Sequence, residues 1–129
     1  MLSLTTLVLA TLNGPVAVSA DVDVAMSWLG LLDAQKWGQS WDGSGKLFRS
    51  NLTQEQWAKT AQAVRDPLGA VSSRVALGVT KAQSLPGAPD GEYEVRQYRT
   101  VFANKASAVE TVVLAREGEE WRVVGYFIR

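Results

Sequence analysis

Apolar side chains recur at helical spacing in two stretches of the first half of the chain. The first stripe lies in residues 21–36 and comprises Val24, Trp28, Leu31 and Leu32. The second comprises Trp57, Ala61, Val64 and Leu68. Each stripe covers one side of a helix. Thr53 and Gln56 form a capping-box pair at the start of the second helix, and Pro67 ends it. Lys46–Arg49 predicts a short helical piece between the two.

The second half of the chain changes to a period of two, which is typical of strands. Val71–Thr80 alternates apolar and polar residues and predicts a half-buried strand. Three further strands are expected in Glu92–Phe102, Ser107–Arg116 and Trp121–Arg129. The apolar phase of Glu92–Phe102 switches near Arg96, which predicts a bulge there or a strand that is apolar on both faces.

Helices followed by antiparallel strands predict an α+β fold. We expect two to three N-terminal helices to pack on a curved, four-stranded antiparallel sheet. A sheet whose strands carry apolar side chains on both faces must be shielded from water on both faces. The helices cover one face in this interpretation, and a partner subunit covers the other, so a homodimer through the sheet is one hypothesis.

The N-terminal residues predict an export signal. Met1–Ala20 contains an apolar run too short to span a bilayer, then Gly14-Pro15, then small residues at Val18 and Ala20. No Lys or Arg precedes the apolar run, which departs from the usual pattern. We therefore expect a signal peptide in residues 1–20 and a single domain in residues 21–129. The mature protein is expected to be periplasmic or secreted, with no membrane span.

Composition excludes several chemistries. The chain has no cysteine and no histidine, which removes disulfides, thiol nucleophiles, the Ser–His–Asp triad and nearly all zinc sites. Acidic and basic residues balance at 13 each, so the basic surface of a nucleic-acid-binding protein is missing. No loop has the spacing of a calcium or phosphate site. We therefore expect no metal, no cofactor and no nucleic-acid partner.

Five residues are candidate pocket residues: Trp41, Asp42, Tyr98, Glu110 and Tyr126. Asp42 beside an aromatic wall is either a carboxylate with a raised pKa or a cap for the following short helix. Glu110 lies in mid-strand among apolar neighbours. It is either an acid inside the fold or half of a cross-strand ion pair on a solvated or dimer-facing surface of the sheet, and its possible partners are Arg74, Arg96 and Arg99.

Two further groups of side chains have structural interpretations. Arg65 and Asp66, just before Pro67, are interpreted as an ion pair at a helix end. The other tryptophans are interpreted as core residues rather than as a ligand box.

Several segments resemble one known family. In the second half they are Leu85–Tyr93, Phe102–Lys105, Ala108–Val112 and Trp121–Ile128, and in the first half Trp28-Leu29-Leu32-Asp33, Ser40–Asp42, Leu47–Arg49 and Thr53–Trp57. They are similar to the domain-of-unknown-function family 4019 (DUF4019) over most of Met26–Ile128. Gly43 stands where members usually have Ala. The resemblance implies a small exported bacterial protein and no known activity. The order of elements also resembles the cystatin-like, NTF2-like cone, and that analogy supplies no function.

Two functions remain open at this point. The leading hypothesis is a noncatalytic exported domain that binds a small apolar ligand or a protein partner, or serves as an accessory in an envelope assembly. The alternative is a small enzyme of the cone fold that uses a buried carboxylate, Asp42 or Glu110, for acid–base chemistry.

Overall fold

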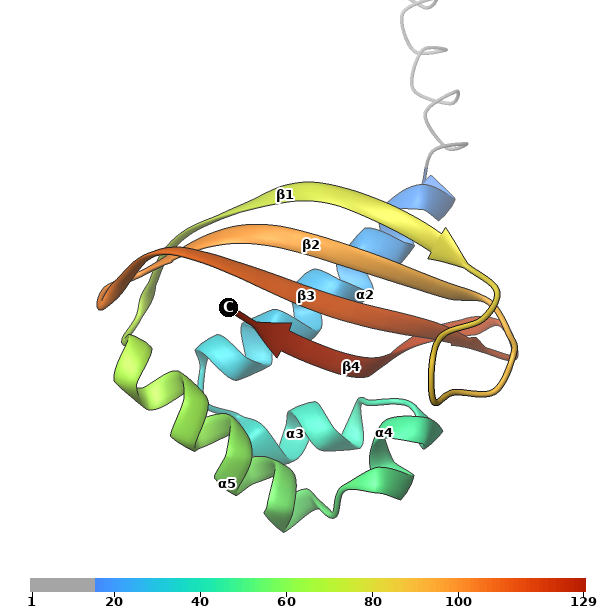
Figure 1. Ribbon diagram of the computed structural model, residues 1–129, viewed down its shortest axis with the longest axis horizontal. Coiled ribbons are helices and arrows are strands. Elements are labelled where there is room, and N and C mark those ends of the chain that lie inside the picture. The colour runs from blue at the N-terminus through green and yellow to red at the C-terminus, as the bar shows by residue number, and fades with distance from the viewer. Residues whose placement is uncertain (1–15) are drawn as a thin grey trace, which may run out of the picture.

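Helices occupy the first half of the described chain and strands the second (Figure 1). The computed structural model describes the backbone of residues 16–129 and the side chains from residue 24 onward. Within these residues the elements are α2 (Val16–Asp33), α3 (Trp37–Asp42), α4 (Lys46–Asn51), α5 (Gln54–Arg65), the 3-10 turn η1 (Asp66–Leu68), β1 (Val71–Ala82), β2 (Tyr93–Phe102), β3 (Lys105–Glu117) and β4 (Glu120–Ile128). The predicted α+β class is confirmed.

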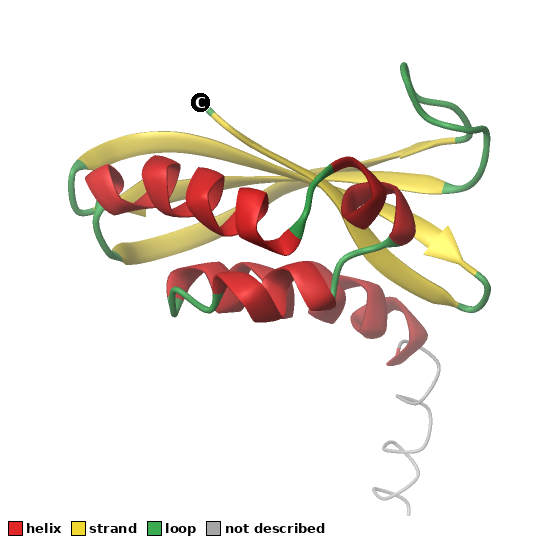
Figure 2. Cartoon of the chain, turned by 90° about the horizontal axis from the view of Figure 1, so that it is seen from below, coloured by secondary structure: helices red, strands yellow, loops and turns green. Residues whose placement is uncertain are grey.

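The four strands form one antiparallel sheet in the order β1-β2-β3-β4. Helix α2 crosses behind the sheet in Figure 1, and α3, α4 and α5 continue this helical layer beyond the β4 edge. The view from below shows the β1–β2 loop rising on the opposite side from α2 (Figure 2). The sheet therefore has an inner face, which packs on helices, and an outer face, which carries none of the described helices.

The core lies between α2, the shorter helices and the inner face of the sheet. Helix α2 contributes Ala25, Trp28, Leu29 and Leu32, and the sheet contributes Tyr98, Val112, Leu114 and Val123. Aromatic rings join the two sides, because Trp57 of α5 stacks on Trp28 at 5.9 Å and meets Phe48 of α4 edge-on at 4.9 Å. The interpretation of Trp28 and Trp57 as core residues is confirmed, since they are 3% and 5% exposed.

Helix α2 differs from the predicted 21–36 helix at both ends. It begins at Val16, so it includes the last five residues of the predicted signal; residues 1–15 of that signal lie outside the described part of the chain. It ends at Asp33 because Gln35 has a φ of 61°. The amides of Gln35 and Lys36 then donate to the carbonyls of Leu32 and Leu31, a Schellman-type ending.

The connection between α2 and α5 holds more helix than predicted. Residues 40–42 form the end of α3, a helix for which the sequence shows no apolar stripe. The start of α5 is as predicted: the Thr53 side chain accepts from the Gln56 amide, and the Gln56 side chain accepts from the Thr53 amide. The helix ends at Arg65, and η1 carries Pro67 near its start.

The predicted bulge lies in the neighbouring strand. Pairing of β1 with β2 jumps from Ala76–Tyr98 to Gly78–Gln97, so Leu77 of β1 is the extra residue. Strand β2 itself alternates regularly, with its even-numbered residues buried on the inner face. The predicted bulge in β2 is wrong because two charged residues, Glu94 and Arg96, lie on the buried face of this strand. They pair with each other at 2.6 Å, so the alternation of apolar residues does not show which face is buried.

Strand β1 is far more exposed than a half-buried strand. Val75, Leu77 and Val79 are 60%, 47% and 49% exposed. The physical reason is that β1 is an edge strand, paired only with β2. Alternation in the sequence is the same for an edge strand and for a covered one, so the pattern does not distinguish them.

Candidate functional site

A fully buried carboxylate lies on the inner face of β3. Glu110 accepts hydrogen bonds on Oε1 from Nε of Arg74 at 2.8 Å and from the hydroxyl of Thr100 at 2.6 Å. The hydroxyl of Tyr126 donates to its other oxygen, Oε2. Both oxygens are therefore occupied, by donors from β1, β2 and β4. The predicted cross-strand pairing with Arg74 is confirmed, but on the covered face of the sheet.

A second carboxylate extends this cluster to the helices. Asp33, the last residue of α2, accepts from Arg65 of α5 at 2.7 Å and from both terminal nitrogens of Arg74 at 2.8 and 3.0 Å. Nη1 of Arg65 lies 4.0 Å from Glu110, and its guanidinium stands over the Phe102 ring at 4.9 Å. We call Asp33, Arg65, Arg74 and Glu110 the ion cluster. Its two acids and two bases cancel, which limits the cost of burying charge.

The ion cluster shifts the pKa of its members. Burial alone would raise the pKa of Asp33, but hydrogen bonds from Arg74 and Arg65 outweigh it and hold the pKa below the ordinary aspartate value. Burial would lower the pKa of Arg74, and hydrogen bonds to Asp33 and Glu110 raise it instead. Burial and the adjacent Glu110 raise the pKa of Tyr126. Tyr126 therefore stays a hydrogen-bond donor to Glu110 at neutral pH.

The lowered pKa of Asp33 predicts an acid-sensitive fold. A depressed folded-state pKa gives stabilisation that is complete above the unfolded value, about 3.9, and is lost as pH falls through the folded value. We expect the free energy of unfolding, measured by urea titration, to fall from about pH 4 downward. At neutral pH the Asp33→Asn variant should have a lower free energy of unfolding than wild type. Below about pH 4 it should lose less of that free energy than wild type does. Asp90→Asn, in an exposed loop, is the control. Parallel curves for wild type and Asp33→Asn would contradict this assignment.

Three of the five sequence-predicted residues lie together. Tyr98 pairs with Glu110 across β2 and β3, and Tyr126 bonds Glu110 from β4. Trp41 and Asp42 lie elsewhere, at the end of α3. The Trp41 indole donates to the Leu52 carbonyl at 2.7 Å. Asp42 is exposed. Its carboxylate accepts a hydrogen bond from the side-chain amide of Gln54 at 3.1 Å and does not cap α4.

Sequence reasoning missed Asp33, Arg65 and Thr100 as members of this network. Arg65 was assigned to a helix-end pair with Asp66, and that interpretation is wrong, because its ion-pair partner is Asp33. Asp33 lies 32 positions before Arg65 and 41 before Arg74. No local pattern joins residues at such separations, so only the packing of α2 and α5 on the sheet reveals the cluster.

A second polar network fixes the tryptophans of the core. The buried hydroxyl of Ser40 accepts from the Trp57 indole at 2.8 Å and donates to the Trp37 carbonyl at 2.6 Å. The Trp28 indole donates to the Ser40 carbonyl at 2.9 Å and to the Ser44 hydroxyl at 3.2 Å. Each of these buried indole N–H groups thus has an acceptor, as buried tryptophans require. Ser40 of α3 and the following Ser44 therefore fix the orientation of the Trp28 and Trp57 indoles.

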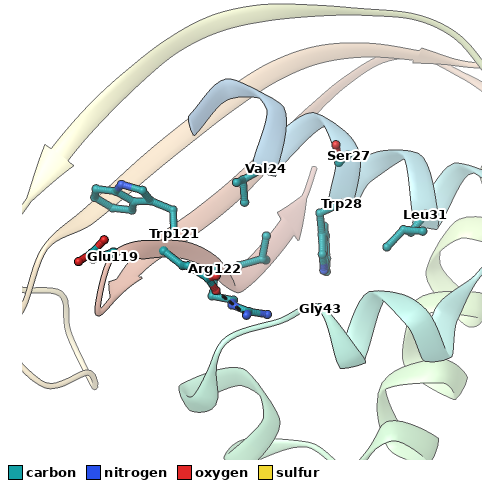
Figure 3. Close-up of a pocket in the computed structure, with 10 residues that line it drawn as sticks. Val24, Ser27, Trp28, Leu31, Gly43, Glu119, Trp121 and Arg122 are labelled. Atoms are coloured by element: carbon teal, nitrogen blue, oxygen red, sulfur yellow. Dashed lines mark hydrogen bonds and ion pairs between the residues drawn. The ribbon is translucent and has the colours of Figure 1, made fainter. Parts of the chain in front are cut away.

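An open groove of about 470 Å³ lies between α2 and the β3–β4 turn. Figure 3 shows Val24, Trp28 and Leu31 of α2 on one side and Trp121 and Arg122 of β4 on the other, with Gly43 at one end. Its walls are mainly apolar. The rim is charged, and Arg122 pairs there with Glu120 at 2.6 Å. This size and character fit a small-molecule site. The groove and the ion cluster are separate features.

Within the described part of the chain, whose side chains begin at residue 24, no cluster of acidic side chains has the arrangement of a metal site. In the same part of the chain, no helix has the length and apolar character needed to cross a bilayer.

Helices on one face of a four-stranded meander, with an apolar groove at their margin, define a small α+β domain. The chain belongs to the family described as "Protein of unknown function (DUF4019)", whose model matches residues 24–126. The matched segment contains the ion cluster and the residues of the groove named above. The family resemblance predicted from the sequence is therefore confirmed. A comparison with curated proteins finds no match.

Proposed function

We propose that this protein is an exported, noncatalytic binding domain whose groove between α2 and the β3–β4 turn holds a small apolar molecule. The observation that carries the proposal is the groove itself: about 470 Å³, with tryptophan on both sides and a charged rim. Ligand sites are typically concave, mostly apolar and edged by a few polar groups. Arg122, Glu119 and Ser27 supply such groups here.

The placement of the carboxylates favours binding over catalysis. A general acid or base needs a proton-bearing group within reach of a substrate. Glu110 has both oxygens occupied by Arg74, Thr100 and Tyr126 and is fully buried. Asp42 lies on the surface beside Gln54, and its side chain does not line the groove. Neither of the two carboxylates considered for the enzyme alternative lines the groove between α2 and the β3–β4 turn.

Export is part of the proposal and rests on the leader pattern of residues 1–20. The described packing is compatible with cleavage after Ala20. The α2 side chains of the core begin at Ala25, and those of the groove begin at Val24. A mature chain that starts at Asp21 keeps all of these contacts.

A dye titration tests the groove. We expect the neutral apolar dye N-phenyl-1-naphthylamine to bind the purified protein and to quench tryptophan emission from Trp28 and Trp121 by energy transfer. Leu31→Gln should weaken binding about tenfold, because it removes apolar contact worth about 1.5 kcal/mol from the groove wall. Val64→Gln, on the exposed side of α5, should bind as wild type does. Equal affinities for the two variants would place the dye elsewhere and contradict the proposal.

A further inference from the structure

The groove between α2 and the β3–β4 turn follows the axis of α2. Val24, Trp28 and Leu31 line it and belong to one side of that helix. From Val24 to Leu31 the helix axis extends about 10 Å, at the usual rise per residue. Figure 3 shows Trp121 toward one end of the groove and Leu31 and Gly43 toward the other. A ligand that lies along α2 therefore reaches Gly43 at the end of its path.

The backbone does not require glycine at position 43. Gly43 has a φ of −84° and a ψ of −1°, a conformation open to residues with a side chain. A Cβ there would meet only the carbonyl oxygens of Gln39 and Ser40, at 3.5 and 4.0 Å. By contrast, a Cβ on Gly45 would lie 2.5 Å from the carboxylate of Glu117. Because glycine loses more conformational freedom on folding than alanine does, its presence at position 43 needs a reason outside the fold.

The backbone around Gly43 is held in place from both sides. The amide of Gly43 donates to a carbonyl of α3 at 3.0 Å, and the amide of Gly45 donates to the Val123 carbonyl of β4 at 2.7 Å. Between them, the hydroxyl of Ser44 accepts from the Trp28 indole at 3.2 Å. These hydrogen bonds fix this end of the groove, so a longer ligand or a larger side chain does not displace it easily.

We infer that Gly43 sets the length of the ligand: the groove takes an apolar molecule that lies along α2 and ends at the Gly43 backbone. The inference rests on the proposed function, because it concerns the same groove. The missing side chain leaves room for the end of the ligand. A methyl group at position 43 takes the place of about one ligand methylene, and a leucine side chain takes the place of several.

Gly30 is the matched control for Gly43. It is exposed on α2, it does not line the groove, and a Cβ there would meet no atom within 4 Å. Gly30→Ala and Gly43→Ala should each raise the folding equilibrium constant about two- to fivefold, because alanine restricts the unfolded chain. Only Gly43→Ala should change ligand binding. A purely structural role for Gly43 predicts no such difference between the two variants.

A series of unbranched alcohols tests the length limit. The alcohols from 1-hexanol to 1-dodecanol are used to displace bound N-phenyl-1-naphthylamine from the purified protein. In wild type, each added methylene should tighten binding about fourfold until the chain fills the groove, and further carbons should add nothing because they stay in water. Gly43→Leu should move this limit to a clearly shorter alcohol, and Gly43→Ala should move it by about one methylene. Gly30→Ala should keep the wild-type limit.

Two results would overturn the inference and leave the proposed function intact, because the dye still binds in both. The first is the same limit, or no limit, in wild type and in the Gly43 variants. The second is an equal shift of the limit in Gly30→Ala and Gly43→Ala, because stability and not space would then control binding. If Gly43→Leu does not fold, Gly43→Ala decides. A wild-type protein that does not bind the dye contradicts the proposed function, and this inference with it.

Discussion

Replacing Glu110 by alanine should lower the free energy of unfolding by about 3–5 kcal/mol, the cost of leaving a buried charge without its partner. Arg74 would lose the acceptor of its Nε, and the hydroxyls of Thr100 and Tyr126 would lose theirs. The ion cluster would keep two arginines and one acid. Urea denaturation, followed by tryptophan fluorescence and by circular dichroism, measures the loss.

Two further variants make this prediction specific. Glu120→Ala breaks an ion pair of the same length, 2.6–2.8 Å, but on the surface, and should cost less than about 1 kcal/mol. Adding Arg74→Met to a Glu110→Leu chain should recover part of the stability, since apolar residues often replace a buried pair at little cost. A Glu110→Ala protein within about 1 kcal/mol of wild type would show that the carboxylate does not hold the sheet to the helices.

Replacing Trp57 by alanine should cost about 3–5 kcal/mol, the usual range for deleting a buried large aromatic side chain. The ring stacks on Trp28 at 5.9 Å and meets Phe48 at 4.9 Å, so its removal opens a cavity where α2, α4 and α5 meet. Trp57→Phe keeps most of the packing and loses the hydrogen bond to Ser40, for about 1–2 kcal/mol. The same urea titration measures both.

Trp121 is the control for this substitution. It is partly exposed at the groove, and Trp121→Ala should cost clearly less than Trp57→Ala. If the two alanine variants lost the same stability, the aromatic cluster around Trp57 would not be the centre of the core.

Local patterns predicted the elements that local forces determine. The Thr53 capping box and the Pro67 stop act within a few residues, and both are present in the structure. The end of α2 was placed three residues late because Gln35, which adopts positive φ, is not a residue type that signals a helix end. Burial of β1 was overestimated, since its edge position depends on strand order and not on its own sequence.

The candidate site was predictable only in part. Tyr98, Glu110 and Tyr126 could be grouped because they lie on neighbouring strands and alternation assigns each to a face. Asp33 and Arg65 come from two helices whose crossing brings them to Arg74, and nothing within either helix indicates that contact. The groove lies between α2, the first described element, and the turn that precedes β4, the last one. Sequence patterns do not indicate a contact between segments so far apart in the chain.

Native mass spectrometry of the protein purified from the periplasm of an expressing bacterium tests the central claim most directly. The account predicts a chain that begins at Asp21 and carries a noncovalent small molecule, which is lost or strongly depleted in Leu31→Gln and retained in Val64→Gln. A chain that still contains residues 1–20, or a ligand-free mass in wild type and both variants alike, would contradict an exported domain that binds through this groove.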